Sequence, residues 1–147
     1  MQSDRPITPV PDAAGNPAYF IAVKQDRTLR RRADDALRRS EERFGKAFRA
    51  SPDELSIITM QGRYVDVNDT FLRVSGYTRE EVVGRTVVEV ERGVDPDDHR
   101  IVTEQLRVTG TLRDRETTVR ARTGEARQVL VSAELIDLGG EPCVLWI

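Results

Sequence analysis

The sequence predicts an α+β fold, in which short helices lie across one face of a five-stranded antiparallel sheet and an amphipathic helix precedes the domain. Two short strands at residues 55–67 form a hairpin around the turn Gln61-Gly62. Helix signals follow, and the chain after residue 110 alternates between β-rich runs and glycine-containing turns. Because strands and helices are segregated along the chain, the order is that of an α+β domain.

Composition narrows the functional classes. The 147 residues suit one ordinary domain with an attached segment, and a net charge of −2 gives no reason to expect a nucleic-acid partner. We expect no membrane contact, since no apolar run is long enough to span a bilayer. The single cysteine, Cys143, excludes an internal disulfide and any multi-cysteine metal site. A cytoplasmic location is the expectation.

The hairpin leads into a capped helix. Asn68 follows the second strand at an N-cap position, where its amide oxygen can accept hydrogen bonds from the first-turn N–H groups. Apolar side chains at Phe71 and Leu72 give this helix a buried side, and Gly76 ends it.

Three further helical segments are expected. Thr78 with Glu81 forms a capping-box pattern that starts a second short helix. Residues 87–90 could form one more helical turn. Asp95 before Pro96 then starts a longer helix, which ends at Gly110. Three strands follow at about residues 112–122, 126–136 and 142–147.

The run from Gly62 to Arg85 resembles the front half of a PAS domain, the small sensory module of bacterial signalling proteins. The positions that carry the resemblance are Asn68, Phe71, Gly76, Tyr77, Glu81 and Gly84. The resemblance covers residues 53–147 and implies the PAS fold and a role in signal transduction. By analogy the parent is a sensor histidine kinase of a two-component system, with cyclic-dinucleotide enzymes and transcription regulators as alternatives.

The last three strands carry apolar residues on both faces. We place Val119, Val129, Val131 and Leu145 on one face, and Leu130, Ile136, Val144 and Trp146 on the other. A sheet covered on one face only would alternate between apolar and polar residues. The second face is therefore expected to be covered by the preceding helix, by a partner chain, or by both.

Residues 28–50 predict that preceding helix. It is amphipathic and charged, and acids four residues before bases support it, as in Asp34 with Arg38. A short coiled-coil seam and simple packing on the domain's own sheet both remain open, and the resemblance implies that this helix dimerises and carries signals. The expected dimer and signalling positions are Leu37, Phe44, Ala47 and Phe48, with Ala33 and Ser40 on the same side.

The first 26 residues resemble the last hairpin of the domain itself. Shifting the chain by about 125 residues superimposes Asp12, Gly15 and Pro17 on Asp137, Gly140 and Pro142, and the apolar Tyr19 and Phe20 on Val144 and Leu145. We therefore divide the chain into residues 1–26, the tail of a preceding PAS domain in a tandem array, residues 27–51, the linker helix, and residues 52–147, the PAS domain. A native N-terminal extension is the alternative for residues 1–26.

The sequence offers no catalytic constellation. It has no Gly-rich phosphate loop, no nucleophile elbow and no paired metal-ligand spacing. We expect neither enzymatic activity nor a metal site in this chain, although the parent protein could carry an enzyme domain.

No cofactor is expected either. Haem-binding relatives use a histidine on the long helix, but His99 lies in the polar first turn beside Asp97, Asp98 and Arg100 and is predicted to face solvent. Flavin photochemistry of the light-oxygen-voltage kind needs a cysteine in the helical part, whereas Cys143 lies on a strand.

A non-covalent ligand inside the fold remains open. The sequence favours a filled core and a dimeric signal-relay module, and the alternative is a sensor that holds a small molecule in an internal pocket. Arg115 and Thr117 share the side of Val119 and could favour a carboxylate-bearing ligand, unless Arg115 pairs with an acid or reaches solvent. The pocket positions, each equally explained as core, are Ile57, Val67, Phe71, Tyr77, Val83, Val90, Val102, Leu106, Arg115, Thr117, Val119, Val131 and Leu145.

Overall fold

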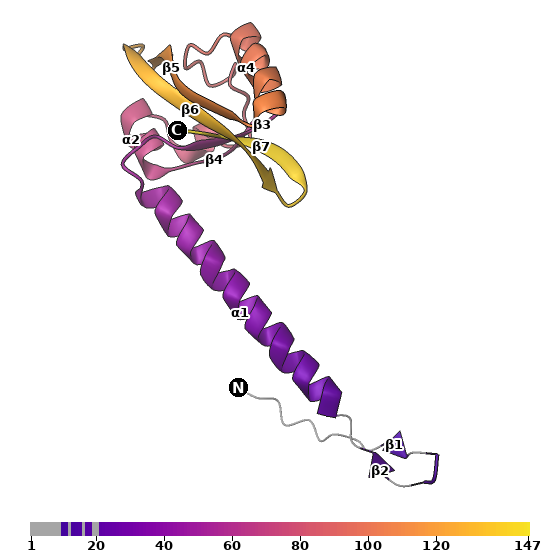
Figure 1. The fold of residues 1–147 in the computed structure, drawn as a ribbon. Coiled ribbons are helices and arrows are strands. Elements are labelled where there is room, and N and C mark those ends of the chain that lie inside the picture. The colour runs from indigo at the N-terminus through magenta and orange to yellow at the C-terminus, as the bar shows by residue number, and fades with distance from the viewer. Residues whose placement is uncertain (1–9, 12, 16, 19–20) are drawn as a thin grey trace. The chain divides into compact units, whose positions relative to one another are not determined.

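A computed structural model describes residues 10–11, 13–15, 17–18 and 21–147. The chain divides into two compact units, Met1–Phe44 and Gly45–Ile147. In the first unit the strands β1 (Val10–Pro11) and β2 (Pro17–Ala18) pair antiparallel (Figure 1). Asp12, Tyr19 and Phe20, on which the comparison with the last hairpin depends, lie outside the described residues.

Helix α1 spans Ile21–Ala50, so it begins seven residues before the predicted start at residue 28. Its last residues belong to the second unit. Among the described residues, no helix is both long and apolar enough to cross a membrane.

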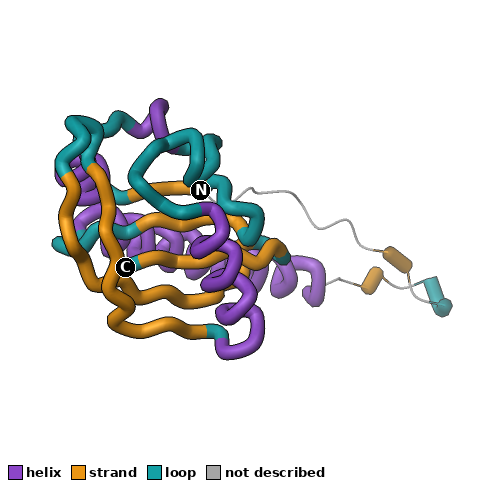
Figure 2. Tube along the Cα trace, turned by 90° about the horizontal axis from the view of Figure 1, so that it is seen from above, coloured by secondary structure: helices purple, strands orange, loops and turns teal. Residues whose placement is uncertain are grey.

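The second unit contains a five-stranded antiparallel sheet, which confirms the predicted fold class. The strands are β3 (Ser56–Thr59), β4 (Tyr64–Val67), β5 (Thr111–Arg120), β6 (Ala126–Leu138) and β7 (Glu141–Trp146). They are arranged in the order β4-β3-β7-β6-β5, so the hairpin that starts the domain joins the last strand at the centre of the sheet (Figure 2).

Three helices connect the two halves of the sheet: α2 (Asp69–Ser75), α3 (Arg79–Val82) and α4 (Pro96–Thr109). The predicted caps are present. Asn68 accepts a hydrogen bond from the Phe71 N–H at 3.0 Å, and the Glu81 carboxylate accepts one from the Thr78 N–H at 3.0 Å. Residues 87–90 form the one helical turn that was predicted, in which the Val90 N–H donates to the Thr86 carbonyl at 3.1 Å.

The predicted faces of β7 were wrong by one residue. The two-residue turn after Leu138 pairs this residue with Glu141, and the same register pairs Leu135 with Val144 and Ala133 with Trp146. Val144 and Trp146 therefore share the face of Val129 and Val131, and Leu145 lies on the other face. A shift of one residue exchanges every side chain between the faces of a strand.

The second face of the sheet is covered in part by the end of α1. Phe48 is 5% exposed and packs in one cluster with Ile57 of β3 and Cys143 of β7. Leu145 and Ile136 pack against this cluster, which we call the Phe48 cluster. Further along the same face Leu130 is 61% exposed. The two central strands thus have the helix end on one side and the domain's main core on the other.

Candidate functional site

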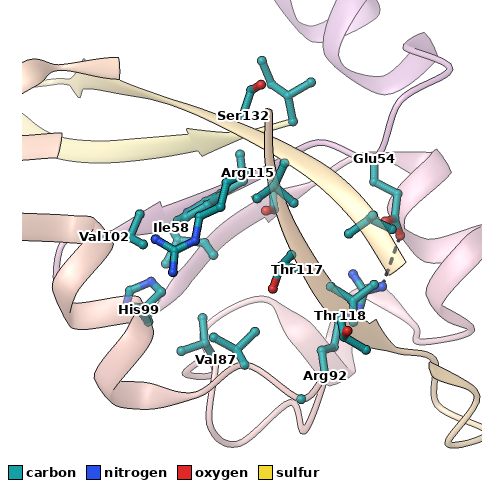
Figure 3. A pocket seen from close by; sticks show the side chains of 18 of the residues that line it. Glu54, Ile58, Val87, Arg92, His99, Val102, Arg115, Thr117, Thr118 and Ser132 are labelled. Atoms are coloured by element: carbon teal, nitrogen blue, oxygen red, sulfur yellow. Dashed lines mark hydrogen bonds and ion pairs between the residues drawn. The ribbon is translucent and has the colours of Figure 1, made fainter. Parts of the chain in front are cut away.

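A cavity of about 710 Å³ lies between the inner face of the sheet, helix α4 and the segment of residues 87–95 (Figure 3). Its apolar wall comes from β3, β5 and β6 and from the facing helices, two arginines lie at opposite ends, and Thr117 lies between them (Figure 3). One end is formed around Arg92 and Glu54, and the other around His99 and Arg115. The volume is of the size that small-molecule sites have in proteins.

The cavity brings together about half of the pocket positions predicted from the sequence. Those that line it are Phe71, Val102, Arg115, Thr117, Val119 and Val131. The others lie elsewhere: Val67 and Val90 are in the core cluster around Phe71, Tyr77 and Val83 pack against that cluster, and Leu106 is in the cluster beneath α4.

The predicted pocket positions Ile57 and Leu145 were wrong, because both residues lie on the opposite face of the sheet in the Phe48 cluster. They pair with each other across β3 and β7. Their neighbours Ile58 and Trp146 line the cavity instead. The sequence could not distinguish Ile57 from Ile58, because β3 has only four residues and both of these are apolar and at most 4% exposed.

Arg115 reaches the cavity as predicted, but it has a partner. A bulge in β5, with Asp114 at φ 50°, precedes it. Its guanidinium forms an ion pair with Asp98 at the start of α4. Both side chains are partly exposed. The sequence analysis left open such a pairing with an acid. Asp98 thus occupies the positive charge of Arg115 to which a carboxylate ligand would bind.

The opposite end of the cavity holds an arginine that the sequence analysis missed. Arg92 is 6% exposed, and its guanidinium lies 3.3 Å from the Glu54 carboxylate and 4.6 Å from the centroid of the Phe71 ring. Its Nε donates to the Arg120 carbonyl at 3.2 Å. No periodic pattern marks this loop arginine in the sequence, so only the tertiary structure identifies it.

Tyr64 lies on the same side of the cavity. Burial raises the pKa of its hydroxyl to about 12, although the nearby Arg92 charge acts in the opposite direction. The hydroxyl is therefore neutral at physiological pH.

His99 does not face solvent, contrary to the prediction. Its ring lines the cavity (Figure 3). The centroid of the His99 ring lies 6.2 Å from that of the Trp146 ring. Burial lowers the pKa of the His99 imidazole, and the adjacent Asp98 carboxylate only partly offsets this. The polar neighbours in sequence were misleading, because His99 precedes Val102 and Leu106 by three and seven residues and so shares their buried side of α4.

Two polar atoms at this end lack protein partners. Nε2 of His99 and Nε1 of Trp146 are buried, and neither has a hydrogen-bond partner in the described part of the chain. An indole N–H can only donate, whereas a neutral imidazole has one donor and one acceptor nitrogen. Buried polar groups without partners are uncommon and call for a structural reason.

Among the described residues no group of three or more His, Cys, Asp or Glu side chains could hold a metal ion. Cys143 is buried in the Phe48 cluster, away from the cavity, and burial raises the pKa of its thiol.

Comparison with known proteins identifies the fold family. A family model described as the PAS fold matches residues 42–147. No curated protein gives a significant match.

Solved PAS structures resemble the chain over most of its length. The PAS domain of an HTR-like protein from Haloarcula marismortui is 26% identical with a TM-score of 0.61, and the alignment covers 80% of this chain and 96% of that one. A domain of a sensory box sensor histidine kinase/response regulator from Geobacter sulfurreducens is 29% identical with a TM-score of 0.62, covering 75% and 94%.

Proposed function

We propose that this chain, which belongs to the PAS family, is a non-catalytic sensory module that binds a small molecule in its cavity and transmits occupancy to helix α1. PAS domains are sensory and signalling modules, and the resemblance to a sensor histidine kinase domain supports a signalling protein as the parent. The sequence favoured a filled core, but a cavity of about 710 Å³ favours the alternative, ligand sensing.

One observation carries the proposal: the two central strands contact the cavity with one face and the end of α1 with the other. In β3, Ile58 lines the cavity, and its neighbour Ile57 packs against Phe48. In β7, Trp146 lines the cavity, and its neighbour Leu145 packs against the Phe48 cluster. A ligand that displaces Ile58 or Trp146 therefore moves a peptide unit whose other side supports α1.

Coupling of this kind needs a ligand that distinguishes two arrangements of the strands, since a ligand with equal affinity for both shifts nothing. The Phe48 cluster supplies a contact that can differ between them. The proposal requires no cofactor.

Native mass spectrometry of the purified chain, with an absorbance spectrum of the same sample, tests ligand binding. We expect extra mass that is released on denaturation, without a haem or flavin band. An apo mass, unchanged when the chain is incubated with a library of small molecules, would contradict ligand sensing and favour the relay reading.

The second candidate role is dimerisation through α1, which the exposure of its apolar side chains favours. Leu37 and Phe44, seven residues apart, are 60% and 53% exposed, and Leu29, earlier in the same helix, is 61% exposed. Residues seven apart lie on the same side of a helix, as in a coiled-coil seam. The occupant of this side is a second copy of α1.

The variant Phe44→Glu tests the dimer by placing a charge in the seam. We expect sedimentation to show a weaker dimer for this variant. Arg39→Glu is the matched control, because residue 39 is exposed and lies about 140° away from residue 44 around the helix. Equal sedimentation of Phe44→Glu, Arg39→Glu and the parent chain would refute this role.

A further inference from the structure

We infer that the cavity takes an uncharged, mainly apolar molecule with one hydroxyl or carbonyl oxygen, and that this oxygen hydrogen-bonds the Trp146 indole and the His99 ring. The inference rests on the proposed function and deepens it, since it names the chemical class of the ligand.

The middle of the cavity supports an apolar ligand body. Ile58, Val87 and Val102 line it from β3, the loop before α4, and α4 itself (Figure 3). Val119 and Val131 line it from the sheet. None of these side chains can form a hydrogen bond. Burial of apolar surface against them is the main source of binding free energy that this region offers.

The charges at the two ends argue against an anionic ligand. Arg92 is paired with Glu54, and Arg115 is paired with Asp98, so each of these lining arginines already has a carboxylate partner. An anion would have to displace one of these carboxylates and meet the other acids of the wall, which include Asp53 and Asp95. A neutral ligand leaves both ion pairs intact.

The unpartnered nitrogens set the position of the oxygen. Trp146 Nε1 can only donate, so it requires an acceptor atom, and a hydroxyl or carbonyl oxygen supplies one. His99 of α4 lies near Trp146 of β7 at this end of the cavity, and a hydroxyl can bond either tautomer of the His99 ring because it both donates and accepts. Both nitrogens are covered in this structure, so binding includes a rotation of one or both rings toward the oxygen.

Composition makes this end of the cavity directly observable by NMR. The chain has one tryptophan and one histidine. The indole N–H signal of Trp146 and the ring signals of His99 are therefore unique in the spectrum, and each reports on one of the two proposed hydrogen bonds.

The test compares three probes with the same ring system: 2-naphthol, naphthalene and 2-naphthoate. Each is titrated into the full ¹⁵N-labelled chain at pH 7, where 2-naphthol is neutral and 2-naphthoate is an anion. We expect 2-naphthol to move the Trp146 indole N–H signal downfield in a saturable manner, and to bind at least about tenfold more tightly than the other two, about 1.4 kcal/mol.

The variant Trp146→Phe removes the N–H and keeps an aromatic ring. Followed by the fluorescence of the probe, it is expected to bind 2-naphthol about tenfold more weakly, with the affinity for naphthalene unchanged. The control Val108→Ala alters an exposed position of α4, 86% accessible, and should bind all three probes as the parent chain does.

Two results would overturn this inference while leaving the proposed function in place. Tightest binding of 2-naphthoate would show that the site prefers an anion, and equal binding of naphthalene and 2-naphthol would show that the two nitrogens do not select an oxygen. If none of the three probes binds, this inference fails, whereas ligand sensing itself fails only if the library tested by native mass spectrometry also leaves the apo mass unchanged.

Discussion

Replacement of Asn68 by alanine is expected to lower the free energy of unfolding by about 3 kcal/mol. Asn68 is fully buried, and its side chain makes three hydrogen bonds. Its oxygen accepts from the N–H groups of Phe71 and Leu55, both at 3.0 Å, and its amide nitrogen donates to the Asp53 carbonyl at 2.9 Å. Loss of an N-cap costs about 1 kcal/mol, and each of the other two bonds contributes a similar amount.

The variant Asn68→Ser separates the two roles of this residue. A serine hydroxyl can still cap α2 through the Phe71 N–H, but one short side chain cannot also reach Leu55 and Asp53. We therefore expect a loss of about 2 kcal/mol for serine, about 1 kcal/mol less than for alanine. Urea unfolding followed by the fluorescence of Trp146 measures both. A loss under about 1 kcal/mol for alanine, or equal losses for the two variants, would refute this reasoning.

Three further predictions concern the cavity ends. Burial lowers the folded-state pKa of His99 below its unfolded value near 6.5, so unfolding takes up protons. The free energy of unfolding should therefore fall as the pH drops from about 7 through the unfolded pKa, and should stop falling below the folded pKa. A His99→Phe variant measured by urea unfolding should lose this pH dependence, and an unchanged slope of stability against pH would contradict the prediction. Glu54→Gln leaves the Arg92 charge buried without its partner and should lower the free energy of unfolding by about 2 kcal/mol. Glu104→Gln, in an exposed pair with Arg107, should change it by no more than about 0.5 kcal/mol, and equal effects of the two variants would refute the argument from burial. Gly62→Ala and Gly124→Ala both place alanine at a φ near +90°, so both should destabilise the fold. Only at Gly62 does the new Cβ come into van der Waals contact with a His99 ring atom, at 3.4 Å, so only Gly62→Ala should shift the His99 ring signals, and unmoved signals would contradict this.

The local features of the fold could be predicted from the sequence because their causes are local. A cap such as Asn68 needs only its own side chain and the next three residues, and Gly76 ends α2 with a φ of 80°, a conformation that glycine adopts readily. The turn glycines and the β-rich runs likewise predicted where each strand begins and ends to within a few residues.

The features that the sequence analysis predicted wrongly or missed depend on contacts between segments that are distant in the sequence. The face of Leu145 follows from the register between β6 and β7, which one residue more or less in the turn would reverse. Arg92 is buried because Glu54, 38 residues away, is paired with it, and no residue near Arg92 in the sequence predicts this pairing. His99 is the exception, since its spacing to Val102 and Leu106 predicts the buried side of α4 and was outweighed by its charged neighbours.

The most direct test of coupling between the cavity and α1 is ¹⁹F NMR of the chain labelled with fluorophenylalanine. The sequence contains four phenylalanines, so the spectrum is simple, and a Phe48→Leu variant assigns the Phe48 signal. During a titration with 2-naphthol we expect the Phe48 signal to move along the same saturation curve as the Trp146 indole N–H. A Trp146 signal that saturates while Phe48 stays fixed would contradict transmission across β3 and β7.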